Sequence, residues 1–190
     1  MEKQHFVFIG AGGVGKTAIR CLWCYQEKLD RDPNYDPTIE AIDQRQIIVD
    51  GKEVLIQITD SGFQFDPDSP KDYNANLIKE ADGFVFIYSI TDQSSLIFIT
   101  QKYEEILKIK NLDKCPMVLV SNKMDLENSI QQVIPSDAGL TLAKKLNIPF
   151  ITTCALKNRV MNIDDIFVSL VKETRKLKQQ EKSRSNCTIA

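Results

Sequence analysis

Side chains that commonly hold transition metals or serve in catalytic triads are scarce in this chain. His5 is the one histidine among 190 residues, and five cysteines are scattered at positions 21, 24, 115, 154 and 187. A single histidine excludes a cluster of histidine metal ligands and a histidine-based catalytic triad. We expect His5 to be a polar residue at a strand edge. The spacing of Cys21 and Cys24 fits a zinc or redox pair, but no second pair follows, so we expect unpaired thiols.

Long hydrophobic runs, internal repeats and a strong charge of either sign are also lacking. We find no apolar stretch long enough to span a membrane and no signal region before the first strand, which predicts a protein that is made and stays in the cytosol. A net charge of −2 argues against a nucleic-acid-binding surface spread over the chain. With 43% apolar and 26% charged residues, the chain suits one compact domain with a substantial core.

What the chain does carry is a glycine-rich segment, GAGGVGKT, at residues 10–17, directly after the apolar residues 6–9. Glycines let the backbone curl around an anion, and the following helix turns its N–H groups and positive end toward it. Lys16 would reach the β- and γ-phosphates of a nucleotide, and Thr17 would bind Mg²⁺. A structural glycine turn would not require Gly-Lys-Thr at this offset. The expected phosphate contacts are Gly10, Gly12, Gly13, Val14, Gly15, Lys16, Thr17 and Ala18.

A second motif selects the base. Residues 118–125, VLVSNKMD, form an apolar strand that ends in Asn-Lys-x-Asp. The Asp125 carboxylate can accept two hydrogen bonds from the N1–H and 2-amino groups of guanine, and adenine lacks this pair of donors. Leaving a buried carboxylate unpaired would penalise adenine by about 1–3 kcal/mol or more. We expect Asn122 to brace the loop and touch the base, and the stem of Lys123 to pack over its face.

Two further segments make the chain resemble a known family. YDPTIE at residues 35–40 is similar to the first switch of the Ras-type small GTPases, and DSGFQ at residues 60–64 occupies the place of the second. The four motifs follow in family order over about residues 5–175. The resemblance implies that Tyr35 contacts the nucleotide and that Thr38 joins Thr17 on Mg²⁺ only while the γ-phosphate is present. It also implies that Asp60 holds the ion through water, and that loss of the γ-phosphate releases both switches.

The second switch departs from this family. The family has a glycine three residues after the aspartate, where this chain has Phe63. If that position needs a positive φ in one nucleotide state, phenylalanine costs on the order of 1 kcal/mol or more. Gln64 nevertheless occupies the family's water-orienting position, and Gln64 and Lys16 are the predicted catalytic residues. The sequence therefore allows two interpretations of the second switch: a loop that supports slow hydrolysis, or a degenerate loop that is inactive.

Other departures bear on partners and affinity. Gly12 leaves room for an arginine finger from an activating protein, whereas the Ala-Ile-Asp of residues 41–43 predicts weak binding of standard Ras effectors. The third base element is Cys154-Ala155-Leu156 instead of Ser-Ala-Lys, so the N–H of Ala155 can reach guanine O6 without the lysine's support. An aromatic residue that would stack on guanine before the first switch is also missing. We therefore expect lower nucleotide affinity or faster exchange.

The C-terminal residues 187–190, CTIA, form a prenylation box at Cys187 whose final alanine favours a farnesyl group. A single lipid anchors only reversibly, and the second signal is a net charge of +4 from residue 172 onward, against −6 for the rest. Each basic residue near an anionic membrane surface contributes roughly 1 kcal/mol. We expect a GTP-binding domain at 1–175, a hypervariable basic tail at 176–190, and a location on the cytoplasmic face of the plasma membrane. The alternative for the basic tail is that it is the solvated end of the last helix and does not bind a membrane.

The alternation of strands and helices, with the family resemblance, predicts an α/β P-loop NTPase domain. We expect a six-stranded, mostly parallel sheet with about five helices on its two faces. Residues 50–52, Asp-Gly-Lys, predict a hairpin and hence one antiparallel pair. Strands are expected at 6–9, 42–49, 54–59, 83–89, 116–121 and 149–153, and helices at 16–28, 93–110, 136–147 and 162–180. An apolar stripe for core packing comprises Ile163, Ile166, Phe167, Leu170, Val171 and Leu177.

These patterns together predict a membrane-anchored switch that binds GTP or GDP with Mg²⁺ and hydrolyses GTP slowly. An exchange factor and an activating protein would set its rates, and effector proteins would bind the first switch in the GTP state. The alternative is a lipid-anchored GTP-binding scaffold with negligible hydrolysis. A P-loop kinase that uses ATP is disfavoured by Asn122 and Asp125.

Overall fold

A six-stranded sheet organises the protein in the computed structural model, which describes residues 1–26, 41–60, 71–155 and 162–187. The strand order is β2-β3-β1-β4-β5-β6, and neighbours run parallel except for the antiparallel pair β2 and β3. The strands are β1 (Glu2–Ile9), β2 (Ala41–Val49), β3 (Lys52–Asp60), β4 (Gly83–Ser89), β5 (Met117–Asn122) and β6 (Phe150–Thr152). This arrangement confirms the predicted mostly parallel sheet with one antiparallel pair.

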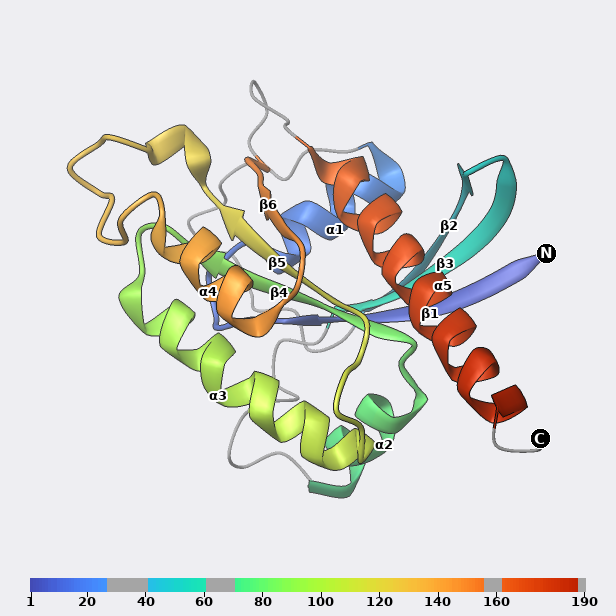
Figure 1. Ribbon diagram of the computed structural model, residues 1–190. Coiled ribbons are helices and arrows are strands. Elements are labelled where there is room, and N and C mark those ends of the chain that lie inside the picture. Colours follow the sequence, from blue (N-terminus) through green and yellow to red (C-terminus); the bar gives the residue numbers. More distant parts are fainter. Residues whose placement is uncertain (27–40, 61–70, 156–161, 188–190) are drawn as a thin grey trace.

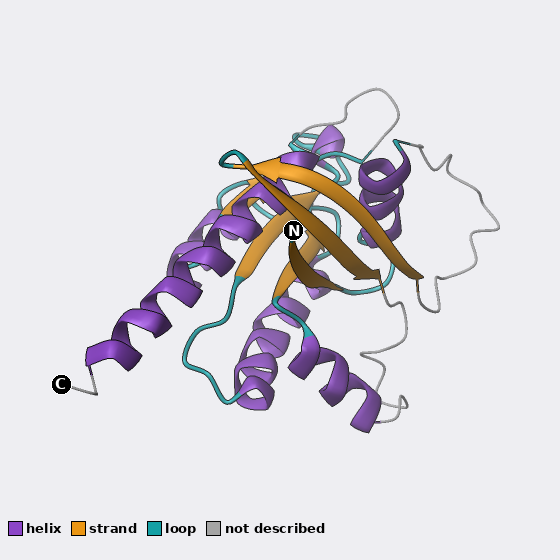
Figure 2. Cartoon of the chain, turned by 90° about the vertical axis from the view of Figure 1, so that its right-hand side faces the viewer, coloured by secondary structure: helices purple, strands orange, loops and turns teal. Residues whose placement is uncertain are grey.

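Helices cover both faces of the sheet, as Figure 1 and Figure 2 show. Helices α1 and α5 pack on one face, and α2, α3 and α4 pack on the other. In the described part of the chain they are α1 (Lys16–Tyr25), α2 (Lys71–Glu80), α3 (Gln93–Lys110), α4 (Ala138–Leu146) and α5 (Ile163–Cys187), with a short 3₁₀ helix at Met124–Leu126. The sequence predicts about five helices but gives ranges for four, and α2 is the one it leaves without a range.

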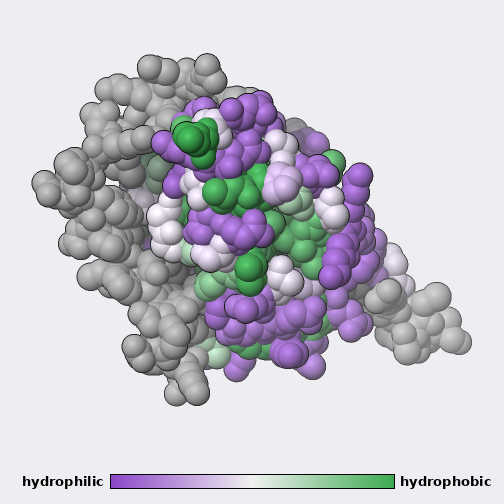
Figure 3. Space-filling view, turned by 90° about the vertical axis from the view of Figure 1, so that its left-hand side faces the viewer, coloured by the Kyte–Doolittle hydropathy of each residue, from purple (hydrophilic) through white to green (hydrophobic). Residues whose placement is uncertain are grey.

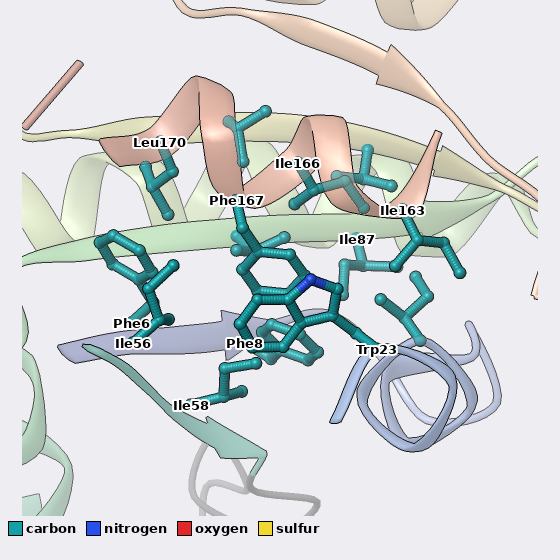
Figure 4. Packing of buried hydrophobic residues seen from close by; sticks show 14 of the residues in the cluster. Phe6, Phe8, Trp23, Ile56, Ile58, Ile87, Ile163, Ile166, Phe167 and Leu170 are labelled. Carbon is teal, nitrogen blue, oxygen red and sulfur yellow. The ribbon is translucent and has the colours of Figure 1, made fainter. Parts of the chain in front are cut away.

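Alternating side chains along the interior strands build one core on each face. Phe6 and Phe8 of β1 point toward α1 and α5, while Val7 and Ile9 of the same strand point the other way. On the first face the Trp23 ring stacks on a phenylalanine of α5 with 3.8 Å between ring centroids (Figure 4). Strands buried on both faces must be apolar at nearly every position, which explains the continuous hydrophobic runs in the sequence.

The hairpin between β2 and β3 forms at the predicted turn. Asp50 and Gly51 both have positive φ, 52° and 73°, as a two-residue type I′ loop requires. Its register places Val49 opposite Lys52 and Ala41 opposite Asp60. The hairpin therefore brings the start of β2 beside the end of β3, where the second switch begins.

Two helices end elsewhere than the sequence predicts. Helix α1 stops at Tyr25 instead of residue 28, because Gln26 takes a left-handed φ of 56° and its N–H donates to the Leu22 carbonyl. Helix α5 continues to Cys187, past the predicted end at residue 180, so the proposed domain boundary at 175 lies within one continuous helix. Leu177, predicted as core, is only half-buried. No helix among the described residues combines the length and the apolar character needed to cross a bilayer.

Hydrophobic side chains on the outer surface are interspersed with hydrophilic ones on the face that Figure 3 shows, which is the left-hand side in Figure 1. The exposed hydrophobic residues of the molecule include Ile97, Ile130, Val133 and Leu140. Single exposed apolar side chains of this kind are ordinary in globular proteins. This face therefore offers no argument for a particular partner.

His5 lies inside β1 (Glu2–Ile9) and not at a strand edge as predicted, and β1 itself lies between β3 and β4. Its backbone N–H donates to Asp82 Oδ2 at 2.9 Å, one residue before β1 begins to pair with β4. The ring is half-buried, with Nε2 at 2.8 Å from Thr59 Oγ1. Burial lowers the pKa of His5, and this outweighs the attraction of Asp82 and Glu80.

His5→Gln should make the protein less sensitive to mild acid. The unfolded chain binds a proton on His5 near the ordinary value of 6.5, whereas the folded chain does so only at lower pH. Stability therefore falls as pH drops below that value in the wild type, and the variant lacks this contribution. Urea unfolding midpoints of both proteins at pH 7.5 and 5.5 provide the measurement. An equal drop in the two proteins would show that His5 does not contribute.

Candidate functional site

The predicted nucleotide-binding segments meet at one edge of the sheet. The loop of residues 10–15 follows β1, Asp60 ends β3, residues 122–125 lie at the end of β5, and Cys154 follows β6. Because these strands are parallel, their carboxyl ends share this edge, which is where such sheets bind ligands.

Gly15 is the tightest point of the glycine-rich loop. It caps the N-terminus of α1 with φ of 101°, a conformation that residues with a side chain rarely adopt. A Cβ on Gly15 would lie 2.2 Å from Asn122 Nδ2, so the loop backbone approaches the base motif too closely for any side chain. A Cβ on Gly10 would likewise lie 2.3 Å from the Ile87 carbonyl oxygen. The loop therefore keeps its backbone N–H groups at the start of α1, in the manner of a phosphate cradle.

Lys16 begins α1 and turns back over this loop. Its Nζ donates to the carbonyls of Gly10 at 2.9 Å and Ala11 at 3.0 Å, and the residue is 7% exposed. Burial lowers the pKa of Lys16, and the nearby negative charge of Asp60 opposes that shift. A buried ammonium held above a ring of backbone groups is placed to neutralise phosphate charge.

Thr17 and Asp60 form a pair of oxygen donors beside the loop. The Thr17 hydroxyl donates to Asp60 Oδ2 at 2.8 Å, and Asp60 is fully buried. Burial raises the pKa of Asp60, whereas the hydrogen bond from Thr17 and the charge of Lys16 lower it. Asp60 Oδ1 is buried and has no hydrogen-bond partner among the described residues. The Thr17 hydroxyl and the Asp60 carboxylate are oxygen ligands of the kind that Mg²⁺ prefers, and Asp60 Oδ1 could contact the ion through water.

Asn122 joins the base motif to the phosphate loop. Its Nδ2 donates to the Val14 carbonyl at 2.8 Å, and the side chain is 2% exposed. Asn122 Oδ1 is buried and has no hydrogen-bond partner in the described part of the chain, so it is available as an acceptor. The two motifs, far apart in the sequence, thus form one site.

Asp125 is held by the segment after β6. Cys154 Sγ donates to Asp125 Oδ1 at 3.1 Å, and Ala155 beside it is 8% exposed. Lys123 has φ of 67°, and this left-handed residue turns the chain from β5 into the short helix that carries Asp125. A half-buried carboxylate fixed by a neighbouring thiol suits recognition of the paired N–H groups of guanine.

Several predicted site residues lie outside the described residues. These are Tyr35 and Thr38 of the first switch, Phe63 and Gln64 of the second, and Leu156 of the third base element. Cys187 is the last residue of α5. The structure brings together residues 10–18, Asp60, residues 122–125, Cys154 and Ala155, and it leaves the roles of the others as predictions.

No disulfide joins Cys21, Cys24, Cys115 or Cys154. Burial raises the pKa of Cys24 to about 12 and that of Cys115 to about 11. A thiol that resists ionisation is a poor redox nucleophile and a poor zinc ligand. Cys24 therefore lacks the reactivity that a redox or zinc pair with Cys21 would need.

Arg20 is a charged residue of this site that the sequence motifs did not reveal. This residue lies one turn after Lys16 on α1, and its guanidinium contacts Asp43 of β2 through Nη1. Its Nε lies 3.5 Å from Asp60 Oδ2. The signal that could have revealed Arg20 is its spacing, because residues i and i+4 share one face of a helix.

Comparison with known proteins shows what the chain resembles. The family model described as "Ras family" matches residues 5–176. The chain is 39% identical to Ras-like protein rasS of Dictyostelium discoideum, over 91% of this chain and 84% of that protein. It is 35% identical to Ras-like protein 2 of Mucor circinelloides, over 97% of this chain and 87% of that protein. It is 34% identical to Ras-like protein 1 of Saccharomyces cerevisiae over 92% of this chain, and this match spans only 53% of the yeast protein.

Proposed function

Because this chain belongs to the Ras family of small GTP-binding switch proteins, we propose that it is a membrane-anchored GTPase that cycles slowly between GTP and GDP. The observation that carries this proposal is the 2.8 Å hydrogen bond from Asn122 Nδ2 to the Val14 carbonyl. It supports the proposal because it joins residues 122–125, the predicted guanine-recognition motif, to the loop of residues 10–15. The site can therefore hold the base and the phosphates of one guanine nucleotide.

The proposed mechanism uses the chain's own groups to hold the phosphates and to orient water. The N-terminus of α1 and Lys16 neutralise the β- and γ-phosphates, and Thr17, Thr38 and Asp60 would hold Mg²⁺. When bound, Mg²⁺ supplies further neutralisation of the charge that develops on the transferred phosphate. Gln64 would orient the attacking water for in-line displacement. Intrinsic turnover is slow because no residue of this set supplies an arginine finger.

Partner proteins would set both rates of the cycle. A Cβ on Gly12 would meet none of the described residues within 4 Å, which leaves room in this part of the site for an arginine from an activating protein. An exchange factor would release GDP. Effector proteins would bind the first switch in the GTP state, with a preference that differs from standard Ras effectors because Ala41, Ile42 and Asp43 replace the usual residues. We propose no nucleic-acid partner.

Membrane anchoring would depend on Cys187 and the basic end of α5. The C-terminal part of α5 projects from the body in both Figure 1 and Figure 2. Lys176 and Lys178 are exposed on α5, where Lys178 also pairs with Asp82. A farnesyl group on Cys187, with these charges, would hold the protein at the anionic cytoplasmic face of the plasma membrane.

Gln64→Leu should abolish single-turnover GTP hydrolysis while leaving nucleotide binding intact. Leucine cannot accept or donate the hydrogen bonds that orient water, and removal of such a positioning group typically costs about 10²-fold or more in rate. Phosphate release from purified protein loaded with GTP in Mg²⁺ is the measurement. Preferential binding of ATP over GTP by the wild type would contradict the GTPase assignment.

Phe63→Gly is the matched variant in the same segment. If wild-type protein binds GTP tightly but releases no phosphate, the lipid-anchored scaffold is the correct function. Recovery of hydrolysis in Phe63→Gly would then identify Phe63 as the cause, because glycine adopts the backbone conformations that phenylalanine resists.

A further inference from the structure

An arginine lies against two carboxylates, and one of them is Asp60, which would hold Mg²⁺. The Arg20 guanidinium contacts Asp43 through Nη1, and its Nε lies 3.5 Å from Asp60 Oδ2. The side chains of Arg20 and Asp43 are each 12% exposed, and that of Asp60 is 0% exposed. This is a nearly enclosed charge cluster, in which solvent screens the interactions only weakly.

The hairpin register explains how both carboxylates reach one arginine. Asp43 of β2 lies opposite Ile58 of β3, and Asp60 follows two residues later on the same strand. Side chains two residues apart on a strand share a face, as do those directly opposite on its partner. Ile58 belongs to the core under α1, so Asp43 and Asp60 face α1 as well. Arg20, one turn along that helix from Lys16, meets them there.

Two side chains of α1 approach Asp60 Oδ2. The Thr17 hydroxyl donates to it at 2.8 Å, and Arg20 Nε, a buried donor with no hydrogen bond among the described residues, lies at 3.5 Å. Under the proposed function, Thr17 and Asp60 are the residues that hold Mg²⁺. A permanent positive charge therefore lies beside the group that must attract a divalent cation.

We propose that Arg20 is an internal cation for Asp60, which lowers the affinity of the nucleotide-bound protein for Mg²⁺ and lessens its need for the ion to retain nucleotide. The inference rests on the proposed function, because it concerns the same metal position. Two cations that neutralise one carboxylate compete for it. When Mg²⁺ is withdrawn, Arg20 remains beside Asp60, so fewer unbalanced charges face the phosphates.

Asp43 sets how strongly Arg20 acts on Asp60. The guanidinium is shared between the two carboxylates, and the Tyr25 hydroxyl also donates to Asp43 Oδ1. Removing Asp43 leaves the positive charge of Arg20 with Asp60 alone. Arg20→Gln and Asp43→Asn should therefore shift the Mg²⁺ affinity in opposite directions, whereas a merely structural role would make both variants lose affinity.

The test uses the full chain loaded with fluorescent GDP, whose release is followed over a series of buffered free Mg²⁺ concentrations. Arg20→Gln should lower the Mg²⁺ concentration for half-maximal retention by about tenfold, and Asp43→Asn should raise it. Chelation of Mg²⁺ should accelerate GDP release more in Arg20→Gln than in the wild type. Arg45→Gln is the matched control, since Arg45 pairs with Asp164 instead of Asp60 and should keep the wild-type midpoint.

The readout is binding, so it is independent of hydrolysis. An unchanged or higher midpoint in Arg20→Gln would overturn the inference, and so would a shift of the same sign in Asp43→Asn. If Arg20→Gln does not fold, a raised midpoint in Asp43→Asn still supports the inference, and a lowered one overturns it. Failure of the wild type to bind GDP at all would overturn the proposed function, and this inference with it.

Discussion

Asp125→Asn should reduce the affinity for GDP on the order of 100-fold and create affinity for xanthosine diphosphate. The carboxylate accepts from both the N1–H and the 2-amino group of guanine, and an amide can accept only one of them while its NH₂ opposes the other. Xanthine carries a carbonyl at the 2-position, so the amide NH₂ of the variant can donate to it. Equilibrium titration with fluorescent GDP and xanthosine diphosphate measures both effects.

The control for this exchange of base preference is Asp113→Asn. Asp113 is exposed in the loop before β5, at the opposite end of that strand from Asp125. The Asp113→Asn variant makes the same change of charge and should leave the affinities for GDP and xanthosine diphosphate at their wild-type values. If Asp125→Asn binds GDP as tightly as the wild type, Asp125 does not read the base and the guanine assignment fails.

Gly15→Ala should cost both stability and nucleotide binding. The φ of 101° is strained for any residue with a side chain, and the new Cβ would lie 2.2 Å from Asn122 Nδ2. Relief requires either the loop or the Asn122 side chain to move, and either movement breaks the 2.8 Å hydrogen bond from Asn122 to the Val14 carbonyl. We expect a loss of about 1–3 kcal/mol in the free energy of unfolding and on the order of 100-fold in GDP affinity.

Gly51→Ala separates the effect of backbone strain from the effect of the close contact with Asn122. Gly51 has φ of 73° in the β2–β3 turn, and a Cβ there would lie more than 4 Å from every neighbour that the structure describes. That variant carries comparable backbone strain far from the nucleotide site, so it should lower stability but leave GDP affinity unchanged. Urea unfolding and fluorescent GDP titration on both variants make the comparison. Normal GDP binding by Gly15→Ala would show that the loop tolerates a side chain.

Much of the fold could be read from the sequence because its signals are local. The apolar residues 6–9 before a glycine loop predict a buried strand that turns into a helix, and Asp50-Gly51 predicts a type I′ hairpin. Helix ends were less predictable. Gln26 ends α1 in a left-handed conformation that glutamine does not favour, and α5 continues past residue 180 to Cys187.

The sequence by itself determined which chemical groups the protein has for a nucleotide, since residues 10–17 and 122–125 carry their backbone conformations and side chains within short segments. Only the tertiary structure decided how these groups meet. The sheet places Asn122 against Val14, the hairpin register places Asp43 and Asp60 on either side of Arg20, and the segment after β6 places Cys154 on Asp125. Short segments fix local backbone conformation, but contacts between distant residues depend on strand order, register and helix packing, which no single segment encodes.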